Sequence, residues 1–140
     1  METQNTETAG YNEQMIYKAL EKTRQRLGLV PSELENVHRR MQEELKDEKT
    51  DRKAVESWLD WFERQADFEP LNGATLTEAR EFLELDREQM AHVCGYEKTK
   101  SRSHIYYRLE KGQRLIIPSI SRLVRSFLSG YRPPDWPDRP

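Results

Sequence analysis

The residues of this chain best suited to chemistry are cations gathered in one short interval. From Lys98 to Arg125 the sequence holds eight Lys and Arg residues against a single acidic residue, Glu110, which gives a net charge of +7. The phosphate backbone of a nucleic acid attracts such a local excess of positive charge. A solvated helix face can show the same excess, so the charge run by itself leaves both interpretations open.

The net charge of the whole chain does not reveal this local excess of positive charge. It has 140 residues and a formal net charge of −2. Residues 1–72 hold 11 Lys and Arg against 16 Asp and Glu, a net charge of −5, whereas residues 73–140 hold 12 against 9, a net charge of +3. Charged residues make up 34% and aromatic residues 9%. This composition is polar but allows small helical cores.

Residue types used in catalysis and metal binding lack the spacing that such sites need. The three histidines and the single cysteine, Cys94, show none of the short paired spacings of a zinc site. His104 directly follows Ser103, and adjacent residues on a helix point in different directions, so these two are no catalytic pair. The sequence contains no Gly-rich phosphate loop and no nucleophile elbow. We therefore expect no enzyme activity, no catalytic residue, no metal and no cofactor.

The apolar segments indicate where the protein resides. No apolar run approaches the roughly 18 residues typical of a membrane span. The first residues, Met1-Glu2-Thr3-Gln4, are polar, with no apolar segment behind them that would suggest a secretory signal. A lone Cys94 fits a reducing compartment. We expect a cytoplasmic protein that does not contact membranes.

Apolar residues at helical spacing predict three helices in the first half of the chain. We expect residues 1–10 to be a disordered tail and residues 11–70 to form an acidic helical domain. Gly28 ends the first predicted helix, Pro31 begins the second, and Thr50 or Asp51 caps the third. The apolar stripes of the second and third helices are Leu34, Val37, Met41 and Leu45, and Val55, Trp58, Leu59 and Phe62.

The second half predicts four short helical segments between residues 76 and 130. Asp86 caps one segment, Pro118 begins the last, and Gly130 ends it. No stretch shows the two-residue alternation of a sheet, so we predict an all-α protein. Residues 131–140 form a proline-rich tail, whose Tyr131 and Trp136 are expected to pack onto the last helix. A peptide ligand for a proline-binding groove is the alternative for this tail.

Residues 81–114 have the features of a helix-turn-helix unit. In such a unit two short helices cross at a fixed angle, and the second enters the major groove of DNA. Ala91 supplies a small residue in the first helix, and Gly95 allows a tight exit. Tyr106 and Leu109 anchor the second helix in the core. The residues expected to reach outward from the second helix are Arg102, Ser103, His104, Tyr107 and Arg108.

Here the sequence resembles the Xre/Cro-like helix-turn-helix regulators, over residues 76–137. The interval from Gly95 to Tyr106 is longer than in the family, and Leu109 replaces the family's tryptophan. The tail from Gly130 to Pro137 is similar to that of some phage-associated members. The matching segments are Leu83-Glu84-Leu85-Asp86-Arg87-Glu88-Gln89-Met90-Ala91, the glycine at Gly95, and Arg108-Leu109-Glu110-Lys111-Gly112-Gln113-Arg114.

The resemblance implies a lambda-repressor-like domain of four to five helices over residues 73–130. It also implies sequence-specific binding of double-stranded DNA by a transcriptional regulator, a repressor of phage or mobile-element origin. Glu110 would be structural. Base edges would be contacted by Arg102, Ser103, His104, Tyr107 and Arg108, and phosphates by Arg87, Gln89, Lys98, Lys100, Lys111 and Arg114.

The acidic first half leaves a second interpretation open. The protein could be a protein-interaction module, such as an antitoxin or phage accessory factor, whose N-terminal helices bind a partner protein. We hypothesise that this half forms a homodimer, because two recognition helices about 34 Å apart double the sequence that is read. Trp61 is either an exposed anchor for a second protein or a residue that packs locally.

Overall fold

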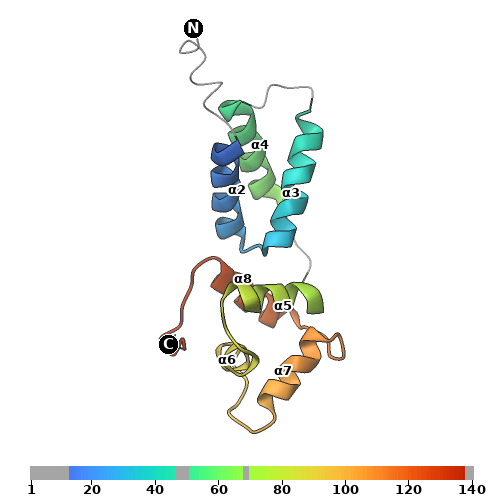
Figure 1. Ribbon diagram of the computed structural model, residues 1–140, viewed down its shortest axis with the longest axis vertical. Helices are drawn as coiled ribbons and strands as arrows, with labels where there is room; N and C mark the ends of the chain where they lie inside the picture. The colour runs from blue at the N-terminus through green and yellow to red at the C-terminus, as the bar shows by residue number, and fades with distance from the viewer. Residues whose placement is uncertain (1–12, 47–50, 68–69, 138–140) are drawn as a thin grey trace. The chain divides into compact units, whose positions relative to one another are not determined.

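The computed structural model describes residues 13–46, 51–67 and 70–137, and every regular element in these ranges is a helix (Figure 1). The all-α class predicted from the sequence is confirmed. The disordered tail predicted for residues 1–10 lies outside the described residues. The helices are α2 (Glu13–Leu27), α3 (Pro31–Glu44), α4 (Arg52–Gln65), α5 (Gly73–Phe82), α6 (Arg87–Val93), α7 (Arg102–Glu110) and α8 (Pro118–Leu128).

The chain divides into two compact units. Of the described residues, the first unit contains 13–27, 31–46 and 51–67, with helices α2, α3 and α4. The second unit contains 28–30 and 70–137, with helices α5 to α8. The three residues Gly28–Val30, which connect α2 to α3, therefore belong to the second unit. The sequence predicts domains over residues 11–70 and 73–130, which would place Gly28–Val30 in the first domain instead.

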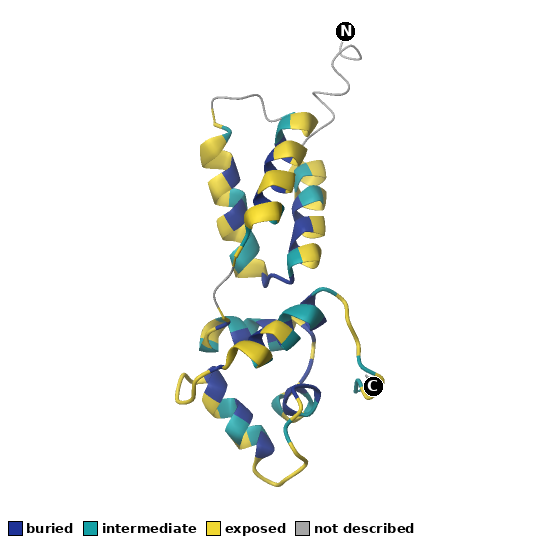
Figure 2. Ribbon diagram, turned by 180° about the vertical axis from the view of Figure 1, so that it is seen from behind, coloured by how far each residue is buried: buried dark blue, intermediate teal, exposed yellow. Residues whose placement is uncertain are grey.

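In the first unit α2, α3 and α4 lie side by side as a three-helix bundle (Figure 1). Buried residues occupy one side of each helix, and exposed residues occupy the other (Figure 2). Asp51 is the N-cap of α4, since its carboxylate accepts a 2.8 Å hydrogen bond from the backbone N–H of Ala54. The stripe predicted for α4 is confirmed, and its buried members are Val55, Trp58, Leu59 and Phe62.

Polar contacts fasten α2 to α4. The carboxylate of Glu63 accepts hydrogen bonds from Nε of Arg26, at 2.7 Å, and from the hydroxyl of Thr23. Burial opposes ionisation of this carboxyl, but the hydrogen bonds from Arg26 and Thr23 outweigh it and hold the pKa of Glu63 below its ordinary value. Thr23 and Arg26 lie near the C-terminal end of α2, and Glu63 lies near the C-terminal end of α4. The two helices therefore run in the same direction.

The second unit is built on a core shared by its four helices. The α6 and α7 helices pack against each other, and α5 contacts both α7 and α8. Asp86 caps α6 as predicted, because its side chain accepts a 2.8 Å hydrogen bond from the backbone N–H of Gln89. Pro118 begins α8, also as predicted. The largest fully buried side chains of this core are Tyr106, Phe127, Leu76, Leu83, Met90, Val30 and Val124.

Gly73 begins α5 at a point where two backbones approach closely. A Cβ atom added to Gly73 would lie 2.3 Å from the carbonyl oxygen of Glu110 at the end of α7. Only glycine, which lacks this atom, allows such an approach without displacing the backbone. Gly73 therefore sets the position of α5 against the C-terminal end of α7.

The segment after Gly130 packs against α8. The ring of Tyr131 stacks on Phe127 with 6.2 Å between ring centroids, and Trp136 meets the same ring edge-on at 5.1 Å. The guanidinium group of Arg132 lies 4.4 Å from the centre of the Trp136 ring. The prediction that Tyr131 and Trp136 pack the tail onto the last helix is confirmed.

Candidate nucleic-acid interface

The α6 and α7 helices are the two that the sequence predicted to form a helix-turn-helix pair. Ala91 of α6 and both Tyr106 and Leu109 of α7 are buried, so the three residues predicted to hold the pair together lie in the core. Residues 94–101 separate the two helices. The long connection expected from the spacing between Gly95 and Tyr106 is therefore present.

Arg102, the first residue of α7, does not point outward. Its side chain is 7% exposed. Nε of Arg102 donates a 2.6 Å hydrogen bond to the carboxylate of Glu88 on α6, and Nη1 donates a 3.2 Å hydrogen bond to the carbonyl oxygen of Tyr96. The expectation that Arg102 is free to contact base edges is wrong, because Arg102 lies one turn before Tyr106 on the buried face of the helix.

His92 extends this network to the tail. Nη1 of Arg102 lies 3.4 Å from Nδ1 of His92, and Nε2 of the same ring lies 2.9 Å from a carboxylate oxygen of Asp135. Arg102 has only donors, so a hydrogen bond between this pair uses Nδ1 of His92 as the acceptor. Glu88, Arg102, His92 and Asp135 thus form one chain of polar contacts, which we call the Arg102 network.

Glu110 lies at the opposite end of α7 and is almost completely buried. Its carboxylate accepts hydrogen bonds from Nε of Arg80, at 2.7 Å, and from Nε of Arg87, at 3.1 Å. Burial opposes ionisation, but these partners outweigh it and hold the pKa of Glu110 below its ordinary value. Burial and the neighbouring Glu110 carboxylate raise the pKa of Tyr106 far above its ordinary range, so the hydroxyl is neutral.

With Arg102 turned inward, other members of the predicted base-contacting set form the outward face of α7. His104 and Arg108 are exposed, and Ser103 and Tyr107 are half-buried. The rings of His104 and Tyr107 stack with 6.0 Å between centroids. Residues three and four apart share one face of a helix, so His104, Tyr107 and Arg108 lie together.

Two cations contact the ring of Tyr107. The guanidinium carbon of Arg87 lies 4.9 Å from the centre of the Tyr107 ring, and Nζ of Lys111 lies 5.3 Å from it. Cations are attracted to the face of an aromatic ring. Because Arg87 also bonds to Glu110, it ties the beginning of α6 to this ring. We call Arg87, His104, Tyr107 and Lys111 the Tyr107 cluster.

The residues predicted to contact phosphates fall into two groups. Gln89 and Arg87 already have roles within the unit: the side-chain oxygen of Gln89 accepts a 3.0 Å hydrogen bond from the backbone N–H of Asp86, which leaves its amide nitrogen for a phosphate. The other group is exposed and makes no ion pair within the described part of the chain. Its members are Lys98, Lys100, Lys111 and Arg114.

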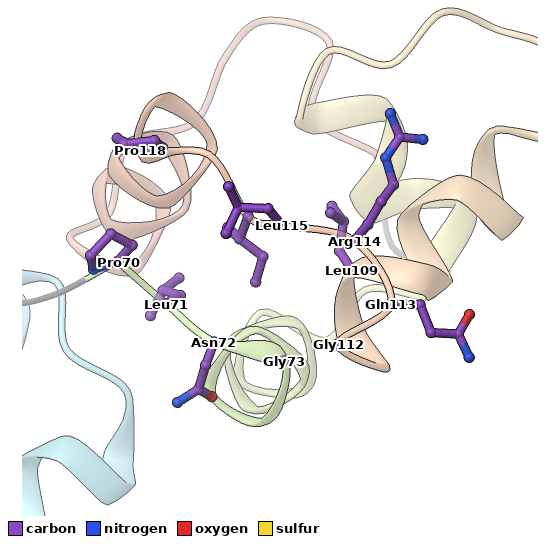
Figure 3. A pocket seen from close by; sticks show the side chains of 11 residues that line it. Pro70, Leu71, Asn72, Gly73, Leu109, Gly112, Gln113, Arg114, Leu115 and Pro118 are labelled. Atoms are coloured by element: carbon purple, nitrogen blue, oxygen red, sulfur yellow. The ribbon is translucent and has the colours of Figure 1, made fainter.

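Sequence reasoning missed an open groove of about 690 Å³ between the N-terminal end of α5 and the connection from α7 to α8 (Figure 3). Leu115 lines it and is 83% exposed. No local pattern could reveal this groove, because its walls come from segments far apart in the sequence. The apolar residues among its lining are Pro70, Leu71, Leu109, Leu115, Ile116 and Pro118.

Cys94 is buried, as predicted, and burial raises the pKa of its thiol to about 12, so the thiol is neutral at ordinary pH. Within residues 13–46, 51–67 and 70–137, no group of three or more His, Cys, Asp or Glu residues could hold a metal ion. No helix in these ranges is long and apolar enough to cross a membrane. No protein-family model, curated protein or solved structure matches the chain.

Proposed function

We propose that the second unit binds double-stranded DNA with α7 in the major groove, and that the protein is a sequence-specific transcriptional regulator of the Xre/Cro-like helix-turn-helix type, acting as a repressor. One observation carries this proposal: between Lys98 and Arg125, the single acidic residue, Glu110, is buried, whereas most of the cations are exposed. The exposed cations are Lys98, Lys100, Arg108, Lys111, Arg114 and Arg122.

This division of charge favours a polyanionic ligand. The carboxylate of Glu110 is enclosed between Arg80 and Arg87, so it does not offset the cations that face solvent. Exposed cations attract phosphates and release the counterions that surround DNA. They would hold the protein on the backbone, whereas specificity would come from contacts with base edges.

The outward face of α7 offers groups for those base contacts. Arg108 presents an exposed guanidinium group, which can bond to the O6 and N7 atoms of guanine in a bidentate manner. Ser103 and His104 lie nearer the beginning of the helix, the part that reaches base edges in helix-turn-helix proteins.

The beginnings of α7 and α8 add backbone donors. No side chain caps α7 at Ser101 or α8 at Ile117, whereas α5 and α6 both carry capping boxes. The unpaired N–H groups at the start of a helix favour phosphate oxygens.

The proposal is tested by selecting bound fragments from random duplex DNA with the full chain, and then measuring affinity for the selected duplex against salt concentration. We expect enrichment of one sequence and a steep loss of affinity, since log K falls by about 0.9 per phosphate contact for each tenfold rise in salt. Absence of enrichment, or binding that does not depend on salt, would contradict the proposal.

A second proposal concerns the first unit, which we infer forms a homodimer or binds a partner protein. Trp61 is 39% exposed, and the guanidinium carbon of Arg40 lies 5.5 Å from the centre of its ring. Trp and Arg are enriched among residues that dominate protein interfaces. Light scattering of wild type and Trp61→Ala at micromolar concentration, with and without DNA, tests this. A monomer under all four conditions would exclude the homodimer.

A further inference from the structure

We propose that Arg102 is the positioning residue of the DNA-binding surface, because it fixes the beginning of α7 on α6 and so orients the outward face of α7. The effect on DNA rests on the proposed function above. The fixing of α7 does not, since it follows from contacts within the second unit.

The beginning of α7 has little else to hold it. Residues 97–101, which lead into the helix, are all exposed. Ser101 provides no side-chain cap, and the backbone N–H of Arg102 makes only a long contact, 3.4 Å, with the carbonyl oxygen of Thr99. A long exposed connection of this kind opens easily unless a tertiary contact closes it. Such a contact has to come from side chains.

Arg102 supplies that contact to three separate segments. Its guanidinium group bonds to Glu88 on α6 and to the carbonyl oxygen of Tyr96 in the connection. Through His92 it also reaches Asp135 of the tail. The planar guanidinium group carries five N–H donors in a fixed fork, whereas the ammonium group of lysine is a compact charge with three donors on a flexible stem. One side chain therefore links the first turn of α7 to α6, to the connection and to the tail.

The charge of Arg102 is paired with the carboxylate of Glu88 within the protein. Its side chain is 7% exposed, and Glu88 is bonded to Nε and to Nη2. A phosphate approaching from solvent would have to displace Glu88 in order to reach it. Loss of Arg102 should therefore change the orientation of α7, while the number of phosphates that the protein neutralises stays the same. This difference separates a positioning residue from a DNA-contacting residue.

The experiment compares the full chain carrying Arg102→Gln, Arg102→Lys or Arg122→Gln with wild type. Arg122→Gln is the matched control for hydrogen exchange, because it removes the same charge from an exposed position on α8, and Lys53→Gln of the first unit is the control for DNA affinity. The first readout is hydrogen exchange of the backbone amides of residues 97–107, without DNA. We expect exchange roughly tenfold faster or more in Arg102→Gln, an intermediate rate in Arg102→Lys, and the wild-type rate in Arg122→Gln.

The second readout is affinity for the selected duplex against salt. Arg102→Gln should weaken binding at every salt concentration with an unchanged salt slope, and Arg102→Lys should recover part of the affinity. Loss of a residue that contacts a phosphate would instead reduce the slope by about 1. Circular dichroism at the working temperature establishes that each variant is folded.

The outcomes separate the two proposals. Wild-type exchange in Arg102→Gln would overturn the positioning role, whether or not the protein binds DNA. Reduced salt slope with unchanged exchange would also overturn it and make Arg102 a DNA contact. Faster exchange in a protein whose wild type binds no duplex would leave the positioning role intact and would refute the proposed function alone.

Discussion

Nε of Arg80 donates a 2.7 Å hydrogen bond to Oε2 of Glu110 and thereby joins α5 to the C-terminal end of α7. The side chain of Glu110 is 1% exposed, and Arg87 of α6 occupies its other oxygen. A buried charge is tolerated only while its partners remain, because an unpaired one has lost its hydration without compensation. Three of the four helices of the second unit therefore depend on one carboxylate.

Removing this carboxylate should destabilise the second unit. Glu110→Ala leaves Arg80 and Arg87 without their partner, and breaking a buried pair costs about 3 kcal/mol or more. Thermal unfolding of the full chain measures the effect as a lowered melting temperature. Glu97→Ala, an exposed acid in the connection before α7, is the control. Equal melting temperatures for the two variants would contradict the role given to Glu110.

Acid should weaken the second unit through the same residue. The pKa of Glu110 is lowered in the folded protein, so its contribution to stability is fully present above the ordinary value of 4.5. That contribution is lost as the pH falls through the lowered pKa, where the carboxylate becomes protonated. Urea unfolding between pH 7 and pH 3 should show stability declining in this window, and less steeply in Glu110→Gln. Parallel pH profiles for wild type and Glu110→Gln would rule this out.

Tyr107 should contribute to DNA binding through its ring. Its two cation–ring contacts hold Arg87 and Lys111 in place before DNA binds. Tyr107→Ala should therefore lower affinity for the selected duplex roughly tenfold, because ordering two freed side chains on binding costs about 0.5–1.5 kcal/mol each. Tyr107→Phe keeps the ring and should remain close to wild type in a fluorescence anisotropy titration. If Tyr107→Phe binds as weakly as Tyr107→Ala, the hydroxyl and not the ring is what matters.

Lys100 should act as a phosphate contact. It is exposed and has no ion-pair partner in the described residues, so Lys100→Gln should reduce the salt slope of DNA binding by about 1, with sequence preference unchanged. Lys53→Gln removes the same charge from an exposed position of the first unit and should leave the slope unaltered. A slope that Lys100→Gln does not change would remove this residue from the interface.

Gly73 should not tolerate a methyl group. Alanine is ordinarily better than glycine in a helix, yet here the added Cβ would lie 2.3 Å from a backbone oxygen of Glu110, a clash that costs about 1–3 kcal/mol. Gly112→Ala is a useful comparison, since that site is open but has a φ of +73°, and the strain there is roughly 1–2 kcal/mol. A rise in melting temperature for Gly73→Ala would show that α5 can shift away from α7.

Much of the fold could be predicted because its signals are local. Asp86 marks a helix beginning through a hydrogen bond to a residue three positions away, and Pro118 marks one through its fixed φ and missing N–H. Tyr106 and Leu109 were assigned to the core from their helical spacing, and both are buried. Such signals need no knowledge of the rest of the chain.

Arg102 shows where this reasoning failed. It lies four residues before Tyr106 and seven before Leu109, so the same spacing that placed those residues in the core also places Arg102 there. Its charge favoured exposure instead, since an arginine is seldom buried without a partner. That partner, Glu88, is fourteen residues away on another helix, and nothing in the sequence links the two.

Contacts between distant segments could not be predicted, because nothing in the sequence links residues that are far apart along the chain. Asp135 reaches His92 from 43 positions along the chain. Val30 lies between two helices of the first unit in the sequence, yet it is fully buried in the core of the second. Hydrophobicity alone predicts that Val30 is buried but does not say against which residues.

The packing of Trp136 and Tyr131 on Phe127 makes the segment after Gly130 part of the folded second unit. A fragment ending at Gly130, where helical content ends, would leave one face of the Phe127 ring open to water and would lose the Asp135 carboxylate from His92. Domain boundaries drawn from helices alone would therefore yield a less stable second unit. Purification tags are better placed beyond residue 137, separated from Trp136 by a spacer.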